Sequence, residues 1–135
     1  MKETLISFQV AKLAKEKGFN EICDSHFEED GGAYDSYGLP FKPNDKQEHE
    51  ILYARPTQSL LQKWLREVHD IIVTPCTFDK GFLEKDKFCY QYYIENKTDL
   101  DDDRLVGMLV YKTWEEALEK GLQEALKFIA DDKEV

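Results

Sequence analysis

The chain has 135 residues, of which 41% are hydrophobic and 13% aromatic, and a formal net charge of −10. The length suits one domain with its own core, and the aromatic content is too high for a disordered acidic tail. No apolar run approaches the roughly 20 residues of a membrane span. The first residues also lack the apolar stretch and cleavage site of a secretory signal. We therefore expect a globular, cytoplasmic protein with no membrane segment.

The negative charge is concentrated in one part of the chain. Residues 21–50 contain nine acidic residues against two lysines, which gives −7 of the total −10. Such a segment can attract a basic protein partner, or it can simply keep the protein soluble, and both interpretations stay open. The whole chain has only three arginines and no basic run, so we expect no direct binding to nucleic acid.

Two helices are predicted in the first half of the chain. Residues 7–17 form the first, because the Ser7 hydroxyl can accept from an otherwise unpaired backbone N–H and Gly18 can adopt the left-handed conformation that closes a helix. The second begins at Thr57, and its apolar residues recur on one face: Leu60, Leu61, Trp64, Leu65 and Val68. Trp64 is central on that face and is predicted to anchor the core.

A third helix begins at a capping box, Thr113 to Glu116, in which the Thr and Glu side chains each satisfy a backbone N–H. Its apolar stripe continues through Leu122 to Ile129. Gly121 lies within that stripe, where it costs up to ~1 kcal/mol relative to Ala. A glycine at this position predicts a close crossing with another element.

Turn and strand signals separate the helices. Residues 27–34 predict a hairpin, because Asp-Gly and Gly-Gly pairs tolerate the positive φ of a tight turn, and residues 50–54 predict a short extended piece. Three further strands are predicted at residues 71–78, 88–94 and 105–111. Pro75 confines the first of these to an edge or a broken strand. Short connections between successive strands favour antiparallel pairing.

These elements predict one α+β domain over residues 1–135. Three amphipathic helices would pack on a small antiparallel sheet, with an additional β-hairpin after the first helix. Residues 23–54 would form an acidic hairpin and loop segment, and residues 131–135 would fray because few apolar groups anchor them.

Cys23 and His26 have a spacing found in zinc sites, and a structural zinc needs four ligands. No second close pair of candidate ligands exists, so we expect no metal and no other cofactor. The alternative interpretation packs Cys23 beside its apolar neighbour and leaves His26 on the hairpin surface. An odd count of three cysteines without a signal sequence indicates free thiols. No catalytic motif is present, although Cys23, His26 and His69 could still converge in space.

Acidic residues alternate at Asp99, Asp101 and Asp103, as at the front of a calcium loop. Arg104 and Val110 then occupy positions where such a loop has glycine and glutamate. We interpret this stretch as a solvated acidic turn between two strands.

The acidic segment also contains four aromatic residues that form a candidate interaction surface: Phe27, Tyr34, Tyr37 and Phe41. Aromatic side chains dominate the energetics of protein interfaces, so these four would make a recognition patch if they were exposed together. If they fold onto the helices, they are part of the core instead.

Two stretches, residues 56–69 (PTQSLLQKWLREVH) and 114–127 (WEEALEKGLQEALK), resemble a family of small proteins common in gut Bacteroidales genomes and their phages and prophages. Residues 23–54 look variable relative to that family. The family has no assigned activity, so the resemblance implies no functional residue. It implies a setting, the bacterial cytosol, which includes phage infection.

Three functional hypotheses follow, all of which assume that Trp64 and Leu122 are buried and that the acidic segment is accessible. The first is a small non-enzymatic module that binds a protein partner through the acidic aromatic segment. The second is a metal- or thiol-dependent enzyme that uses Cys23, His26 and His69. The third is an acidic DNA mimic, which would need carboxylates spaced like phosphates along one face.

Overall fold

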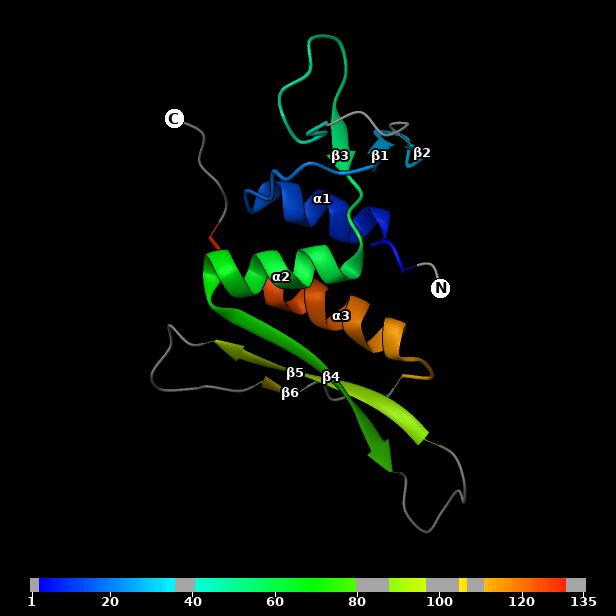
Figure 1. Ribbon diagram of the computed structural model, residues 1–135, viewed down its shortest axis with the longest axis vertical. Helices are drawn as coiled ribbons and strands as arrows, with labels where there is room; N and C mark the ends of the chain where they lie inside the picture. The colour runs from blue at the N-terminus through cyan, green and yellow to red at the C-terminus, as the bar shows by residue number, and fades with distance from the viewer. Residues whose placement is uncertain (1–2, 36–40, 80–87, 97–104, 107–110, 131–135) are drawn as a thin grey trace. The chain divides into compact units, whose positions relative to one another are not determined.

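The computed structural model describes residues 3–35, 41–79, 88–96, 105–106 and 111–130. Within these residues the chain has an α+β fold with three helices and antiparallel sheets, as predicted (Figure 1). It forms two compact units, one of Met1–Leu61 with Leu126–Val135 and one of Gln62–Ala125, which are described separately. The expectation of one domain stays a prediction, and the predicted fraying of residues 131–135 lies outside the described residues.

The first unit begins with α1 (Phe8–Glu16). The Ser7 hydroxyl accepts from the Val10 N–H at 3.3 Å, so the predicted cap is confirmed. Gly18 follows the helix with φ of +95°, the left-handed conformation predicted for it. The chain then turns back, and Phe19 is buried beneath the helix end with its N–H donating to the Ala14 carbonyl at 3.0 Å.

A three-stranded antiparallel sheet follows, formed by β1 (Ser25–Glu28), β2 (Ala33–Asp35) and β3 (Leu52–Ala54) in the order β2-β1-β3. The predicted hairpin is confirmed, with Gly31 at φ of +90° in its turn. Helix α1 covers the face of the sheet that carries Phe27 and Tyr53, because the Phe8 ring lies 5.3 Å and 5.6 Å from those two rings.

Residues 41–51, which precede β3, are joined to the rest of the unit by hydrogen bonds, two of which Asn44 makes. The Asn44 amide donates to the Phe19 carbonyl at 2.6 Å, and its side-chain oxygen accepts from the Ala54 N–H at 2.7 Å. The Cys23 N–H also donates to the Phe41 carbonyl at 2.9 Å. The side chain of Asn44 therefore bonds to the Ala54 N–H of β3 as a strand neighbour would, and it links residues 41–51 to that strand.

Helix α2 (Gln58–His69) begins after Thr57, whose hydroxyl accepts from the Leu60 N–H at 3.1 Å, as predicted. Leu61 and Leu65 are fully buried, and Trp64 is 6% exposed. Val68 was expected on the same apolar face, but it is 57% exposed. The buried stripe therefore ends one turn before the helix does.

The second unit contains the sheet β4-β5-β6, made of β4 (Ile71–Asp79), β5 (Phe88–Asn96) and β6 (Leu105–Val106), all antiparallel. Pro75 lies on β4, which is an edge strand among the described residues, as the missing N–H of proline requires. Val73 pairs with Ile94 and Pro75 with Tyr92. These four residues share the buried face of the sheet.

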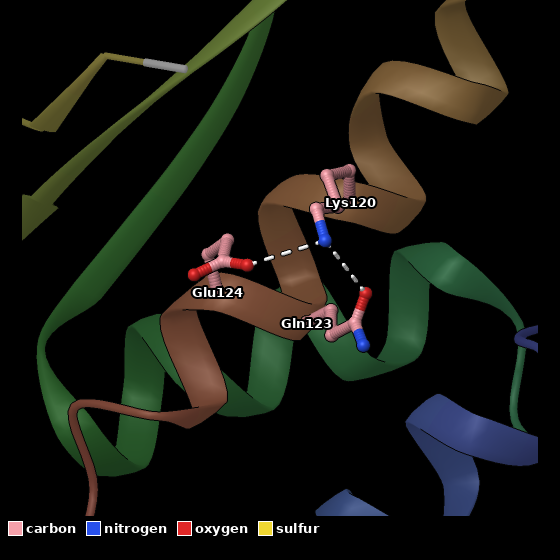
Figure 2. A network of polar contacts seen from close by, with 3 residues as sticks. All are labelled: Lys120, Gln123 and Glu124. Carbon is pink, nitrogen blue, oxygen red and sulfur yellow. Dashed lines mark hydrogen bonds and ion pairs between the residues drawn. The ribbon is translucent and has the colours of Figure 1, made fainter. Parts of the chain in front are cut away.

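Helix α3 (Trp114–Leu126) starts at the predicted capping box. The Thr113 hydroxyl accepts from the Glu116 N–H at 3.1 Å, and the Glu116 carboxylate accepts from the Lys112 N–H at 3.4 Å. On the polar side of the helix, Lys120 contacts the Glu124 carboxylate at 3.3 Å and the Gln123 side-chain oxygen at 3.4 Å (Figure 2). This i,i+4 pair adds a few tenths of a kcal/mol to helix stability.

The apolar side of α3 packs on β4 and β5. Leu122 is fully buried, as expected, and Gly121 is where the backbones approach most closely. A Cβ atom at position 121 would lie 2.7 Å from Val73 Cγ1 and 3.1 Å from the Tyr92 ring. The predicted close crossing is confirmed, and its partner is the sheet.

We expect Gly121→Ala to lower the free energy of unfolding by about 1–3 kcal/mol, because the added methyl overpacks the crossing. This loss should outweigh the gain in helix propensity of up to ~1 kcal/mol. Urea denaturation of the variant measures the change. In the double variant Val73→Ala/Gly121→Ala, the loss should be smaller than the sum of the two single losses. A Gly121→Ala variant as stable as the wild type would contradict this packing.

Candidate functional site

Three rings of the first unit form one cluster on the outer face of the hairpin. His26 on β1 is the cross-strand partner of Tyr34 on β2, and the two rings stack with centroids 5.9 Å apart. Phe41 meets the His26 ring edge-on, also at 5.9 Å. Tyr34 is 48% exposed and the other two side chains are half-buried. These residues, which we call the His26 cluster, bring together two of the four aromatics expected at an interaction surface.

The other two expected aromatics do not join the cluster. Successive side chains of a strand point to opposite faces, so Phe27 lies on the opposite face of β1 from His26. It is 5% exposed, because it packs against Phe8 and lies under the Arg55 guanidinium at 5.2 Å. Phe27 is therefore core, which corrects its expected place on the surface. Tyr37 lies outside the described residues.

The carboxylates of the acidic segment remain accessible. Among the nine acidic residues of positions 21–50, eight are exposed and Glu28 is half-buried. Both lysines of the segment, Lys42 and Lys46, are also exposed. The His26 cluster therefore lies in a segment whose charge of −7 is presented to solvent.

The two candidate zinc ligands have different surroundings. His26 is held by the rings of Tyr34 and Phe41, and its Nδ1 atom is buried without a hydrogen-bond partner among the described residues. Cys23 is buried and lines a cavity with Ser25 and Arg55, of which His26 is not a lining residue. Within the described part of the chain, no three His, Cys, Asp or Glu side chains gather closely enough to hold a metal ion. Cys23 and His26 are close in sequence, but no third candidate ligand among the described residues lies near enough to complete a metal site with them.

Burial controls the chemistry of the Cys23 thiol. Desolvation raises its pKa to about 12, and the charges of Asp24 and Glu21 add to the effect. The group is therefore a protonated thiol at neutral pH, whereas a cysteine nucleophile requires the thiolate.

His69, the third residue of the enzyme hypothesis, ends α2 in the second unit. Its ring meets Trp64 edge-on with centroids 4.6 Å apart. Burial lowers the pKa of His69, and its Nε2 atom has no hydrogen-bond partner among the described residues. These surroundings favour a neutral packed imidazole.

His26 was considered from the sequence only as a candidate metal ligand or as a residue on the hairpin surface, and its place in the aromatic cluster was missed. The hairpin turn offered the missing signal, because a tight turn fixes the strand register and thereby sets His26 opposite Tyr34. The role of Arg55 over the Phe27 ring was also missed. It depends on the pairing of β1 with β3, residues about 30 positions apart, for which the sequence has no local signal.

No protein-family model, curated protein or solved structure matches the chain. Among the described residues, no helix has the length and apolar character needed to span a membrane.

Protonation of His69 should destabilise the fold, because its folded-state pKa is lower than its unfolded value. The unfolded chain then binds more protons, so the free energy of unfolding falls as the pH drops below about 6.5, the ordinary value for histidine. Urea denaturation at pH 7.5 and 5.5 should show a smaller loss for His69→Gln than for the wild type. His49, whose side chain is 86% exposed, is the control, and His49→Gln should keep the wild-type loss. An unchanged loss in His69→Gln would contradict the burial effect.

The Cys23 thiol should resist alkylation in the folded protein. A rise in pKa from 9.0 to about 12 lowers the thiolate fraction at pH 8 by about a thousandfold. The measurement is the rate of iodoacetamide labelling in Cys76→Ser/Cys89→Ser, which leaves Cys23 as the single thiol, in buffer and in urea. Labelling at similar rates in both solutions would contradict a buried, protonated thiol.

Proposed function

We propose that this protein is a non-enzymatic module that binds a basic protein partner through the His26 cluster. The observation that carries the proposal is the exposed Tyr34 ring, stacked on His26 and set within a segment of charge −7. Exposed aromatics of this kind supply the large, rigid contact area on which interface energy depends.

The cluster is held in position before any partner arrives. His26 and Tyr34 are fixed by the pairing of β1 with β2, and Phe41 is fixed by its carbonyl, which accepts from the Cys23 N–H. Asn44 secures the loop that follows Phe41. A surface that is already ordered loses less conformational entropy on binding, which favours affinity.

The surrounding charge favours a basic partner. Exposed carboxylates speed the approach of a positively charged protein and repel acidic ones, and this effect weakens as salt is added. The aromatic cluster would then supply the short-range contacts. The carboxylates would thus affect the rate of association and the aromatic rings the strength of the bound contact. Variants of the carboxylates and of Tyr34 test these two roles separately.

The thiol-enzyme alternative has less support, since the Cys23 thiol is protonated at neutral pH. The DNA-mimic alternative depends on the same exposed carboxylates as the module but not on the aromatic rings. The bacterial setting implied by the resemblance to the Bacteroidales family stays a prediction.

A photo-crosslinking amino acid placed at position 34 tests the module in a Bacteroidales lysate. Phe128, which is 51% exposed and lies outside the acidic segment, is the matched control position. A protein crosslinked from position 34 but not from position 128 is then purified and its Kd measured by calorimetry. We expect Tyr34→Ala to weaken binding by about 30-fold, the loss typical of an interface hot spot. Phe128→Ala should change the Kd less than twofold.

Two results would contradict the proposal: the same set of proteins crosslinked from both positions, or an unchanged Kd for Tyr34→Ala. Competition by duplex DNA separates the remaining alternative. If DNA displaces the chain from its partner, and neutralising the carboxylates rather than removing Tyr34 abolishes binding, the protein is a DNA mimic.

A further inference from the structure

A second feature of the first unit is a cavity of about 250 Å³ beside the start of α2. Its apolar lining residues include Leu5, Ile22, Pro56 and Leu60. The polar lining includes Asp24, Ser25 and Arg55. Ser25 and His26 are neighbours on β1 and point to opposite faces, so this cavity is separate from the His26 cluster.

Backbone hydrogen bonds between distant segments hold the cavity open. The Ile6 N–H donates to the Pro56 carbonyl at 3.1 Å, and the Gln58 N–H donates to the Thr4 carbonyl at 2.8 Å. The Arg55 N–H donates to the Ser25 carbonyl at 3.0 Å. Three parts of the chain that are far apart in sequence therefore form a pre-formed site.

Arg55 lines this cavity without a carboxylate partner among the described residues. Its Nη1 donates to the Ser25 hydroxyl at 3.3 Å, and its guanidinium lies over the Phe27 ring. Its Nε atom is buried and has no hydrogen-bond partner within the described part of the chain. In a chain of net charge −10, an arginine left unpaired in this way retains donors that suit a carboxylate.

The same cavity presents a carboxylate. Asp24 lines it, is exposed, and forms no ion pair with Arg55 or with another described residue. The cavity thus offers a positive group and a negative group that are not joined to each other. Its volume lies below the ~300–1,000 Å³ of pockets for drug-sized ligands, which limits an occupant to a molecule about the size of an amino acid.

We propose that this cavity binds a small aliphatic zwitterion, of which a free α-amino acid such as leucine is the simplest example. Its carboxylate would bind the Arg55 guanidinium, its ammonium would bind Asp24, and its apolar side chain would lie against Ile22 and Leu60. The neutral thiol of Cys23 adds no third charge to the cavity. Ser25 is a positioning residue, because its hydroxyl orients Arg55.

Titration of ¹⁵N-labelled protein with L-leucine, followed by amide chemical shifts, tests the site. We expect saturable shifts at residues 22–25 and 55–60. Two analogues probe the two charges: 4-methylpentanoate lacks the ammonium and 3-methylbutylamine lacks the carboxylate. Each should bind at least fivefold more weakly than leucine, because each leaves one charged group in the cavity unpaired.

Variants assign the two roles. Arg55→Gln should weaken leucine binding at least tenfold, the loss typical of a charge-assisted hydrogen bond. Asp24→Asn should weaken leucine binding but not 4-methylpentanoate binding. Glu29→Gln is the matched control, because Glu29 is an exposed carboxylate in the hairpin turn that does not line the cavity, and it should leave both unchanged.

Three results would overturn the proposal: no saturable shift with leucine, equal leucine binding in Asp24→Asn and the wild type, or saturable binding of inorganic phosphate in place of leucine. If Arg55→Gln disturbs amide shifts far from the cavity, Asp24→Asn decides the question, because its side chain is at the surface.

Discussion

The alternation of side chains along β1 determines what each face of the first unit can do. Ser25 and Phe27 point to the side covered by α1, where Phe27 contacts Phe8 and supports the Arg55 guanidinium. His26 points to the other side and meets Tyr34. A shift of one residue in the register would exchange the two sets. The buried core and both proposed binding surfaces therefore depend on the register of a single four-residue strand.

Local signals predicted much of the fold. Ser7, Thr57 and Thr113 cap the helices as expected, because each cap depends on a hydroxyl and a backbone N–H only three residues apart. Pro75 on an edge strand and Gly121 at a close crossing were also predictable. Proline has no N–H to donate to a neighbouring strand, so few positions in a sheet accept it. Glycine within an apolar helix face marks a place where no side chain fits.

The arrangement of the candidate sites was harder to predict, because it depends on contacts between distant residues. The composition identified Phe27 as an aromatic within an acidic segment, but its burial depends on which face of the strand α1 covers. The sequence around Asn44 predicts only a loop, although the Asn44 side chain forms hydrogen bonds with the backbones of both Phe19 and Ala54. The cavity that contains Asp24 and Arg55 exists only once β3 lies beside β1. No periodicity in the sequence contains that information.

Helix α2 belongs to both units, and this affects how the protein unfolds. The boundary falls between Leu61 and Gln62, inside one continuous helix, and the chain crosses again at the last residues of α3. Hydrogen bonds in a helix join residues four apart, so several of them span the crossing within α2. Helix formation is cooperative, and melting either unit would fray a helix on which the other depends. The two units should therefore unfold in one transition. We do not expect either unit to fold when it is expressed without the other.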